Sequence, residues 1–197
     1  MRGDLGGPKD CVSVPAPPLV LASTSPQRLA ILEQLAIPFE VVAPDFEEAL
    51  EGDPLDHAAG KARSVDGAGR PVLGVDTVVV CEGRRIGKPR DLDDAARMLE
   101  ALGGRTHEVV SGLCLRTREW EELHAETTRV TFRALSAADI ERYLVAGEWE
   151  GRAGAYAIQG LGAGLVERIE GDYLNVVGLP GALLLRLLAG RFPAEYS

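Results

Sequence analysis

Cysteine is scarce in this sequence of 197 residues. The three cysteines, Cys11, Cys81 and Cys114, are odd in number and form no Cys-x-x-Cys pair. Such a scattered set argues against a disulfide framework and against a structural zinc site, which needs paired Cys or His ligands. The sequence therefore predicts a protein of a reducing cytoplasm.

Long apolar runs are also missing. No stretch reaches the roughly 18 apolar residues that a membrane-spanning helix needs. The opening segment MRGDLGGPKD lacks the apolar core of a secretory signal. We therefore expect a cytoplasmic protein with no membrane partner.

Basic residues are outnumbered, with 21 Lys and Arg against 30 Asp and Glu and a net charge of -9. No basic block compensates, so we expect no nucleic-acid partner, and an anionic ligand must be held by a few locally placed cations. Lysine is the rarer base: Lys9, Lys61 and Lys88 stand beside 21 − 3 = 18 arginines. Either Lys61 and Lys88 lie at positions that need a compact ammonium group, or lysine occurs at these positions by chance on a solvated surface.

The residues that are present indicate one globular domain. Hydrophobic residues make up 46% of the chain and charged residues 26%, which suits a packed core. Residues 1–17, with Gly6-Gly7-Pro8, are predicted to form a flexible leader, and residues 18–197 the domain.

Short apolar runs alternate with amphipathic stretches, which predicts a mixed α/β fold. The predicted strands are residues 19–22, 39–43, 72–80, 108–116, 127–133, 155–159 and 165–169. The predicted helices are residues 26–36, 92–102, 136–146 and 180–190, with a capping box of Ser136 and Asp139 in the third.

The segment LASTSPQR, residues 21–28, joins a predicted strand to a predicted helix. Ser25 falls at the N-cap and Pro26 at the first helical position, so free backbone N–H groups point beyond the strand. Arg28, in the first turn, adds a fork-shaped cation that suits phosphate oxygens. The alternative is an ordinary capped helix.

Asp76 stands alone inside the apolar run of residues 72–80. An unpaired buried carboxylate costs several kcal/mol, so this one needs a cation, a metal or strong hydrogen bonds. A carboxylate on a strand that faces a cleft suits a metal ligand or a general base. The alternative is a structural aspartate that caps a neighbouring loop.

Two further segments carry polar candidates. Lys88 lies on a tight turn in GKPRD, residues 87–91, and is either an anion-binding residue or a surface lysine. Gln159 lies in AGAYAIQG, residues 153–160. Its amide donates and accepts, which suits the edge of a uracil or thymine ring, or it is a plain loop glutamine.

Taken in order, the sequence motifs from residue 19 to about residue 188 resemble those of the Maf family of nucleoside triphosphate pyrophosphatases. They are LASTSPQR, PDFEE, GKA, VLGVDTVV, GKPRD, LGGRTHEVVSG, AGAYAIQG and GDYLNVVGLP. The resemblance implies a twisted mixed sheet flanked by helices, in two lobes with a central cleft, related to the inosine triphosphate pyrophosphatases. It also implies pyrophosphate release from nucleotides with a divalent cation, Mg²⁺ or Mn²⁺.

The resemblance assigns roles to individual residues. Asp76 matches the family's proton acceptor and, with Glu48, a metal site. The expected phosphate-path residues are Ser25, Arg28, Lys61 and Lys88, and the expected base-selectivity residues are Thr77 and Gln159. Gln27 departs from the family, which usually has arginine there, at a position also linked to substrate choice.

The AYAIQG wording resembles the dTTP and UTP branch of the family more than the 7-methyl-GTP branch. We therefore expect hydrolysis of dTTP or UTP, and of modified nucleotides, to the monophosphate and pyrophosphate. Two alternatives stay open: a broader house-cleaning pyrophosphatase that includes 7-methyl-GTP, and a nucleotide-binding regulator of cell division. Assembly into a homodimer is also left open.

Overall fold

The computed structural model describes residues 18–47, 49 and 52–196. The predicted leader, residues 1–17, and the predicted metal ligand Glu48 lie outside the described residues.

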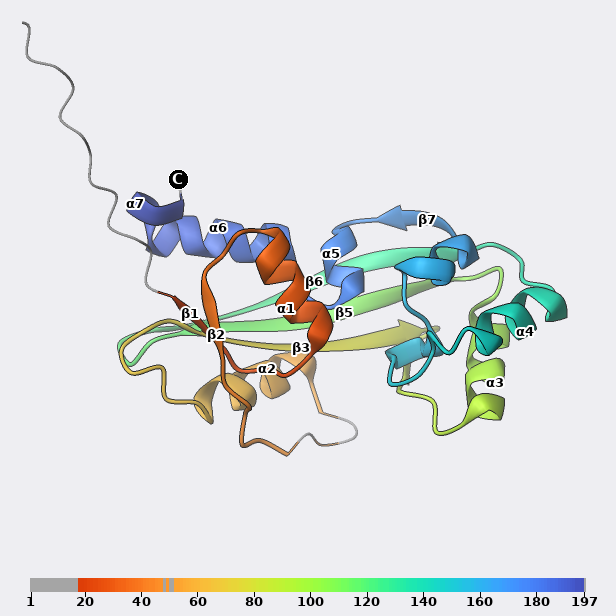
Figure 1. Ribbon diagram of the computed structural model, residues 1–197, viewed down its shortest axis with the longest axis horizontal. Helices are drawn as coiled ribbons and strands as arrows, with labels where there is room; N and C mark the ends of the chain where they lie inside the picture. Colours follow the sequence, from red (N-terminus) through yellow and green to blue (C-terminus); the bar gives the residue numbers. More distant parts are fainter. Residues whose placement is uncertain (1–17, 48, 50–51, 197) are drawn as a thin grey trace, which may run out of the picture.

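The centre of the molecule is one seven-stranded sheet with the order β2-β1-β3-β5-β6-β7, and β4 also pairs with β3 (Figure 1). The strands are β1 (Leu19–Leu21), β2 (Phe39–Val41), β3 (Val72–Cys81), β4 (Arg84–Ile86), β5 (Thr106–Arg116), β6 (Glu121–Phe132) and β7 (Val166–Glu170). β1 is parallel to both β2 and β3, whereas β3, β5, β6 and β7 pair antiparallel in succession. This mixed sheet confirms the predicted α/β class.

Helices cover both faces of the sheet and its far end (Figure 1). The helices are α1 (Pro26–Gln34), α2 (Pro54–Arg63), α3 (Leu92–Leu102), α4 (Ala137–Val145), α5 (Tyr173–Val177), α6 (Gly181–Arg191) and α7 (Pro193–Tyr196), with 3₁₀ turns η1 (Ala153–Ala155) and η2 (Gly160–Leu165). α1, α5 and α6 lie on one side of the sheet and α2 on the other. α3 and α4 lie at the ends of β3, β5 and β6 that are farthest from β1 and β2, and they form a second lobe there.

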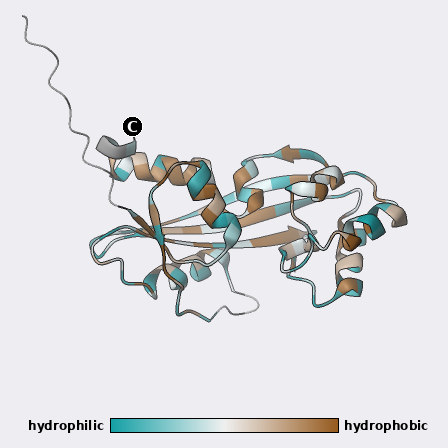
Figure 2. Cartoon of the chain, in the orientation of Figure 1, coloured by the Kyte–Doolittle hydropathy of each residue, from teal (hydrophilic) through white to brown (hydrophobic). Residues whose placement is uncertain are grey.

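Alternation along β3 decides which helix each side chain meets. Leu73 and Val75 belong to a core cluster with α1 and α6, of which α6 is largely hydrophobic in Figure 2. Val72, on the opposite face, packs with the small residues of α2. A Cβ on Gly74 would lie 2.1 Å from the carbonyl oxygen of Ala58, so α2 sits directly against the strand. Asp76, two residues further on, therefore faces α2.

The structure differs from the prediction in several elements. Residues 155–159 are not a strand, because Gly154 and Ala155 have positive φ values of 73° and 58° and bend the chain into η1. α2 was not predicted, although Asp53 caps it through Leu55 N at 2.8 Å and Pro54 begins it. The predicted strand 127–133 is the second half of the longer β6.

The second lobe contains a buried histidine with a consequence for acid stability. His107 is 1% exposed, packs against the Phe132 ring with centroids 5.0 Å apart, and shares a hydrogen bond of 2.8 Å between its Nε2 and the Tyr156 hydroxyl. Burial disfavours the imidazolium and lowers the pKa of His107 from 6.5 to about 4. The native state therefore binds this proton less readily than the unfolded chain does.

We therefore expect His107 to lower the free energy of unfolding as the pH falls from 6.5 to about 4. Full stability is present above the unfolded-state pKa, and the loss reaches about 3 kcal/mol at the native pKa. His107→Gln keeps a nitrogen near the Tyr156 hydroxyl but does not titrate. Urea unfolding at about pH 7.5 and about pH 4 should show a larger loss in the wild type than in the variant. Equal losses would contradict the assignment.

Candidate active site

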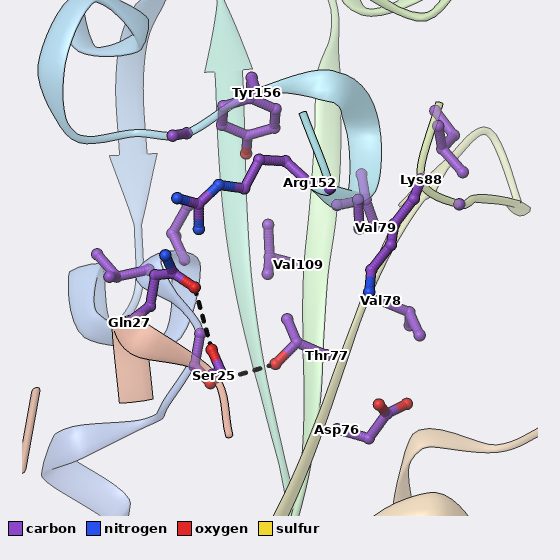
Figure 3. A pocket seen from close by; sticks show the side chains of 18 of the residues that line it. Ser25, Gln27, Asp76, Thr77, Val78, Val79, Lys88, Val109, Arg152 and Tyr156 are labelled. Atoms are coloured by element: carbon purple, nitrogen blue, oxygen red, sulfur yellow. Dashed lines mark hydrogen bonds between the residues drawn. The ribbon is translucent and has the colours of Figure 1, made fainter. Parts of the chain in front are cut away.

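A pocket of about 610 Å³ opens beside the middle of β3 (Figure 3). In the described part of the chain, β1 pairs with Val72 and Leu73 of β3, and β4 pairs with residues 79–81. The stretch of β3 between them faces the pocket with its edge open. Ligands of open α/β sheets bind at such a place, beyond the end of a parallel strand.

Asp76 lies on this open edge and is 5% exposed. Lys61 Nζ donates to its Oδ1 at 2.8 Å, and the Nδ1 of His57 lies 3.2 Å from its Oδ2. Arg85 Nη2 is 3.8 Å from the same Oδ2. Lys61 Nζ also donates to the carbonyl oxygen of Val75 at 3.3 Å, and so supplies a donor to the open edge of β3. The structure thus pairs the isolated acid with a buried cation.

These contacts decide the charge of Asp76. Burial alone would raise the pKa of its carboxyl group, but the positive charge and hydrogen bond of Lys61 oppose this, with help from Arg28 and a hydrogen bond from His57. The net effect lowers the pKa below its ordinary value of 3.8. Asp76 is therefore ionised at neutral pH, in the form that accepts a proton or ligates a metal.

Arg28 connects three segments around the pocket. Its Nε donates to the Gly178 carbonyl at 3.0 Å, its Nη1 to Ser23 Oγ at 3.1 Å and its Nη2 to Thr77 Oγ1 at 3.5 Å. The Thr77 hydroxyl also shares a hydrogen bond of 2.8 Å with Ser111. Arg28 and Thr77 both line the pocket, and both are also hydrogen-bonded to the surrounding protein.

Ser25 occupies the predicted N-cap position of α1, with Pro26 at the start of the helix, but its side chain caps no backbone N–H. Its hydroxyl instead donates to Gln27 Oε1 at 3.0 Å (Figure 3). The predicted N-cap position of Ser25 is therefore confirmed, and Ser25 and Gln27 both line the pocket. This hydrogen bond uses the Gln27 amide oxygen and leaves its amide nitrogen available to the pocket.

The pocket is rich in cations although the net charge of the chain is negative. The described lining residues include six cations and one carboxylate, that of Asp76; the cations are Arg28, Lys61, Arg85, Lys88, Arg90 and Arg152. The Lys88 side chain extends along β3 toward Asp76 (Figure 3). The arrangement suits a polyanion, because a few clustered cations raise the local potential within an acidic protein.

Sequence reasoning missed Arg85, Arg90 and Arg152. Two of them lie close to Lys88 in the sequence, and Arg152 directly precedes AGAYAIQG. Their closeness to these motifs was the sequence signal that could have identified them. Figure 3 shows the Arg152 side chain on the far side of the drawn pocket from Asp76.

The backbone that follows Gln159 is held by hydrogen bonds to Glu148. Glu148 accepts hydrogen bonds from the backbone N–H groups of Leu161 at 3.0 Å and Gly162 at 3.1 Å. Tyr156 lines the pocket and is held through its hydroxyl by His107. Gln159 itself is exposed and lines the pocket, and its role in base selectivity stays a prediction.

The residues present fit a divalent cation delivered with a polyphosphate. No group of three or more His, Cys, Asp or Glu that could hold a metal occurs among the described residues, which do not include Glu48. Mg²⁺ is commonly held by one or two carboxylates together with substrate phosphates and waters. The ionised carboxylate of Asp76, in a pocket whose other described charged residues are cations, fits that mode of binding.

Comparisons with known proteins show the family of the chain. The family model described as Maf-like protein matches residues 18–191. A Deinococcus radiodurans protein named dTTP/UTP pyrophosphatase is 44% identical over 183 residues, covering 89% of this chain and 93% of the relative. A Geobacter protein (strain M21) of the same name is 47% identical over 172 residues, covering 82% and 89%.

Among solved structures, the Staphylococcus aureus Ham1 protein aligns with a TM-score of 0.41 and 16% identity, covering 59% of this chain and 72% of that one. Within the described residues, no helix combines the length and the apolar character needed to cross a membrane.

Proposed function

The chain belongs to the Maf-like protein family, and from that premise we propose that it hydrolyses nucleoside triphosphates, dTTP and UTP foremost, to the monophosphate and pyrophosphate. The observation that carries the proposal is the ionised Asp76, paired with Lys61 in a pocket lined by six cations. Relatives at 44% and 47% identity carry the name dTTP/UTP pyrophosphatase.

Asp76 is the proposed proton acceptor. It would orient a water molecule toward the α-phosphorus and take its proton while the new P–O bond forms. The bond between the α-phosphorus and the bridging oxygen breaks, and its electron pair leaves with pyrophosphate. Lys61, Lys88 and Arg28 would stabilise the negative charge that develops on the phosphates. A bound Mg²⁺ or Mn²⁺, held by Asp76 and Glu48, would offset further phosphate charge.

Base recognition is assigned to Gln159, Thr77 and Gln27, which all line the pocket. Gln159 can donate to and accept from the edge of a pyrimidine ring. Thr77 would act indirectly, since its hydroxyl is already engaged by Ser111 and Arg28. Gln27, with its acceptor oxygen occupied by Ser25, offers amide N–H groups.

We expect Gln27→Arg to sharpen discrimination among bases more than it raises the highest turnover. The substitution removes the acceptor that holds Ser25 Oγ and replaces an amide with a donor-only fork. A mismatched buried polar group costs about 1–3 kcal/mol, so ratios of kcat/KM for UTP, CTP and GTP should change about tenfold. Gln27→Lys adds the same charge without the fork and is the matched control. If the ratios stay within about twofold while all three rates rise, Gln27 acts through charge alone.

The proposal is tested by pyrophosphate release from a panel of canonical and modified triphosphates at equal concentrations. A dTTP/UTP enzyme should favour those two substrates. Equal rates that include 7-methyl-GTP would favour a broad house-cleaning enzyme. Binding without pyrophosphate release would favour a nucleotide-binding regulator. We also place the enzyme in the cytoplasm, a proposal supported by the buried free thiols of Cys81 and Cys114.

A further inference from the structure

We propose that His57, which carries no role in the assignments above, is a positioning residue that sets the plane of the Asp76 carboxylate for water attack. The inference rests on the proposed function. His57 and Lys61 stand four residues apart on α2 and therefore on the same helical face, against β3. Both side chains are buried, with His57 3% and Lys61 5% exposed.

The two residues hold different oxygens of one carboxylate. Lys61 donates to Oδ1 at 2.8 Å, and His57 Nδ1 lies 3.2 Å from Oδ2. An ionised carboxylate only accepts hydrogen bonds, so the imidazole must carry its proton on Nδ1 and donate. An ammonium is a compact charge with rotatable donors, which fixes a distance better than an orientation. A second donor on the other oxygen fixes the carboxylate plane.

The imidazole ring is itself held in place. A Cβ on Gly52 would lie 2.0 Å from His57 Nε2, so the backbone closes directly over the ring. The Phe46 ring packs edge-on with centroids 5.9 Å apart. The Gly52 carbonyl accepts from Arg85 Nη1 at 2.6 Å, and Nη2 of the same arginine lies 3.8 Å from Asp76 Oδ2. His57 thus links the loop before α2 to Asp76.

Packing alone does not explain why position 57 is a histidine and not an apolar residue. Within the part of the chain that the structure describes, its buried Nε2 has no hydrogen-bond partner. Burying a polar atom without a partner costs free energy, and an apolar side chain would avoid that cost. The contact with Asp76 accounts for the retained imidazole.

The test compares three variants at His57. Asn places its amide nitrogen near the position of Nδ1, Gln places it near Nε2, and Leu removes the donor while keeping the site apolar. A misplaced catalytic group can lose up to about a hundredfold in rate. We expect His57→Leu and His57→Gln to lower kcat about 10- to 100-fold with KM for UTP within about twofold, and His57→Asn to stay within about threefold of the wild type.

His124→Leu is the matched control, because it makes the same change at a histidine on β6 that does not line the pocket, and its kcat should remain near the wild-type value. If His57→Leu fails to fold, His57→Phe, which keeps the ring volume, replaces it with the same expectation. Wild-type kcat in the Leu variant, or equal losses in the Asn and Leu variants, would overturn the role of His57. Absence of pyrophosphate release by the wild type itself would instead overturn the proposed function, and this inference with it.

Discussion

Asp76→Asn should lower kcat by about two to four orders of magnitude, the range that general-base catalysis supplies. Asn keeps the shape of the side chain and an oxygen acceptor for Lys61 Nζ, which now donates to Oδ1 at 2.8 Å. It removes the negative charge that accepts the proton. Steady-state pyrophosphate release from UTP measures the effect, and thermal unfolding shows whether the variant is folded.

Asp66→Asn is the matched control for this change. Asp66 is an exposed aspartate that is paired with Arg118 Nη2 at 3.1 Å and does not line the pocket around Asp76. Its loss should change turnover by less than about twofold, because exposed ion pairs contribute little. Retained turnover in a folded Asp76→Asn protein would remove Asp76 from the mechanism.

The second large effect is expected on removal of divalent metal. Activity should vanish in excess chelator and return with Mg²⁺ or Mn²⁺, because a triphosphate carries close to four negative charges and a divalent ion offsets two. The six pocket cations suggest that nucleotide binding partly survives without metal. Titration with UTP in EDTA, followed calorimetrically, separates binding from turnover. Full activity in EDTA would contradict the metal requirement.

The central strand could be predicted from the sequence, together with the most important side chain on it. The apolar run around Asp76 indicated a buried strand, and burial indicated a partner for the carboxylate. Its partner Lys61 could not be found this way, because α2 was not predicted and the two residues are 15 positions apart in sequence. The scarcity of lysine singled out Lys61, but only the family resemblance placed it in the site. His57 matched none of the sequence motifs and was missed for the same reason.

The errors have local physical causes. Residues 155–159 alternate enough to suggest a strand, but positive φ values at Gly154 and Ala155 redirect the backbone. Alternation alone does not reveal such a conformation at an alanine. Ser25 occupies the expected N-cap position, but its hydroxyl donates to Gln27 Oε1 and accepts from no backbone N–H of the helix, a detail that the sequence did not predict.

The central claim is that water attacks the α-phosphorus of a nucleoside triphosphate with Asp76 as proton acceptor. The most direct test is turnover of UTP in water enriched in oxygen-18, with mass spectrometry of the products. The proposed mechanism predicts UMP that carries the label, together with unlabelled pyrophosphate. Label in pyrophosphate, or UDP and labelled inorganic phosphate as the products, would contradict it.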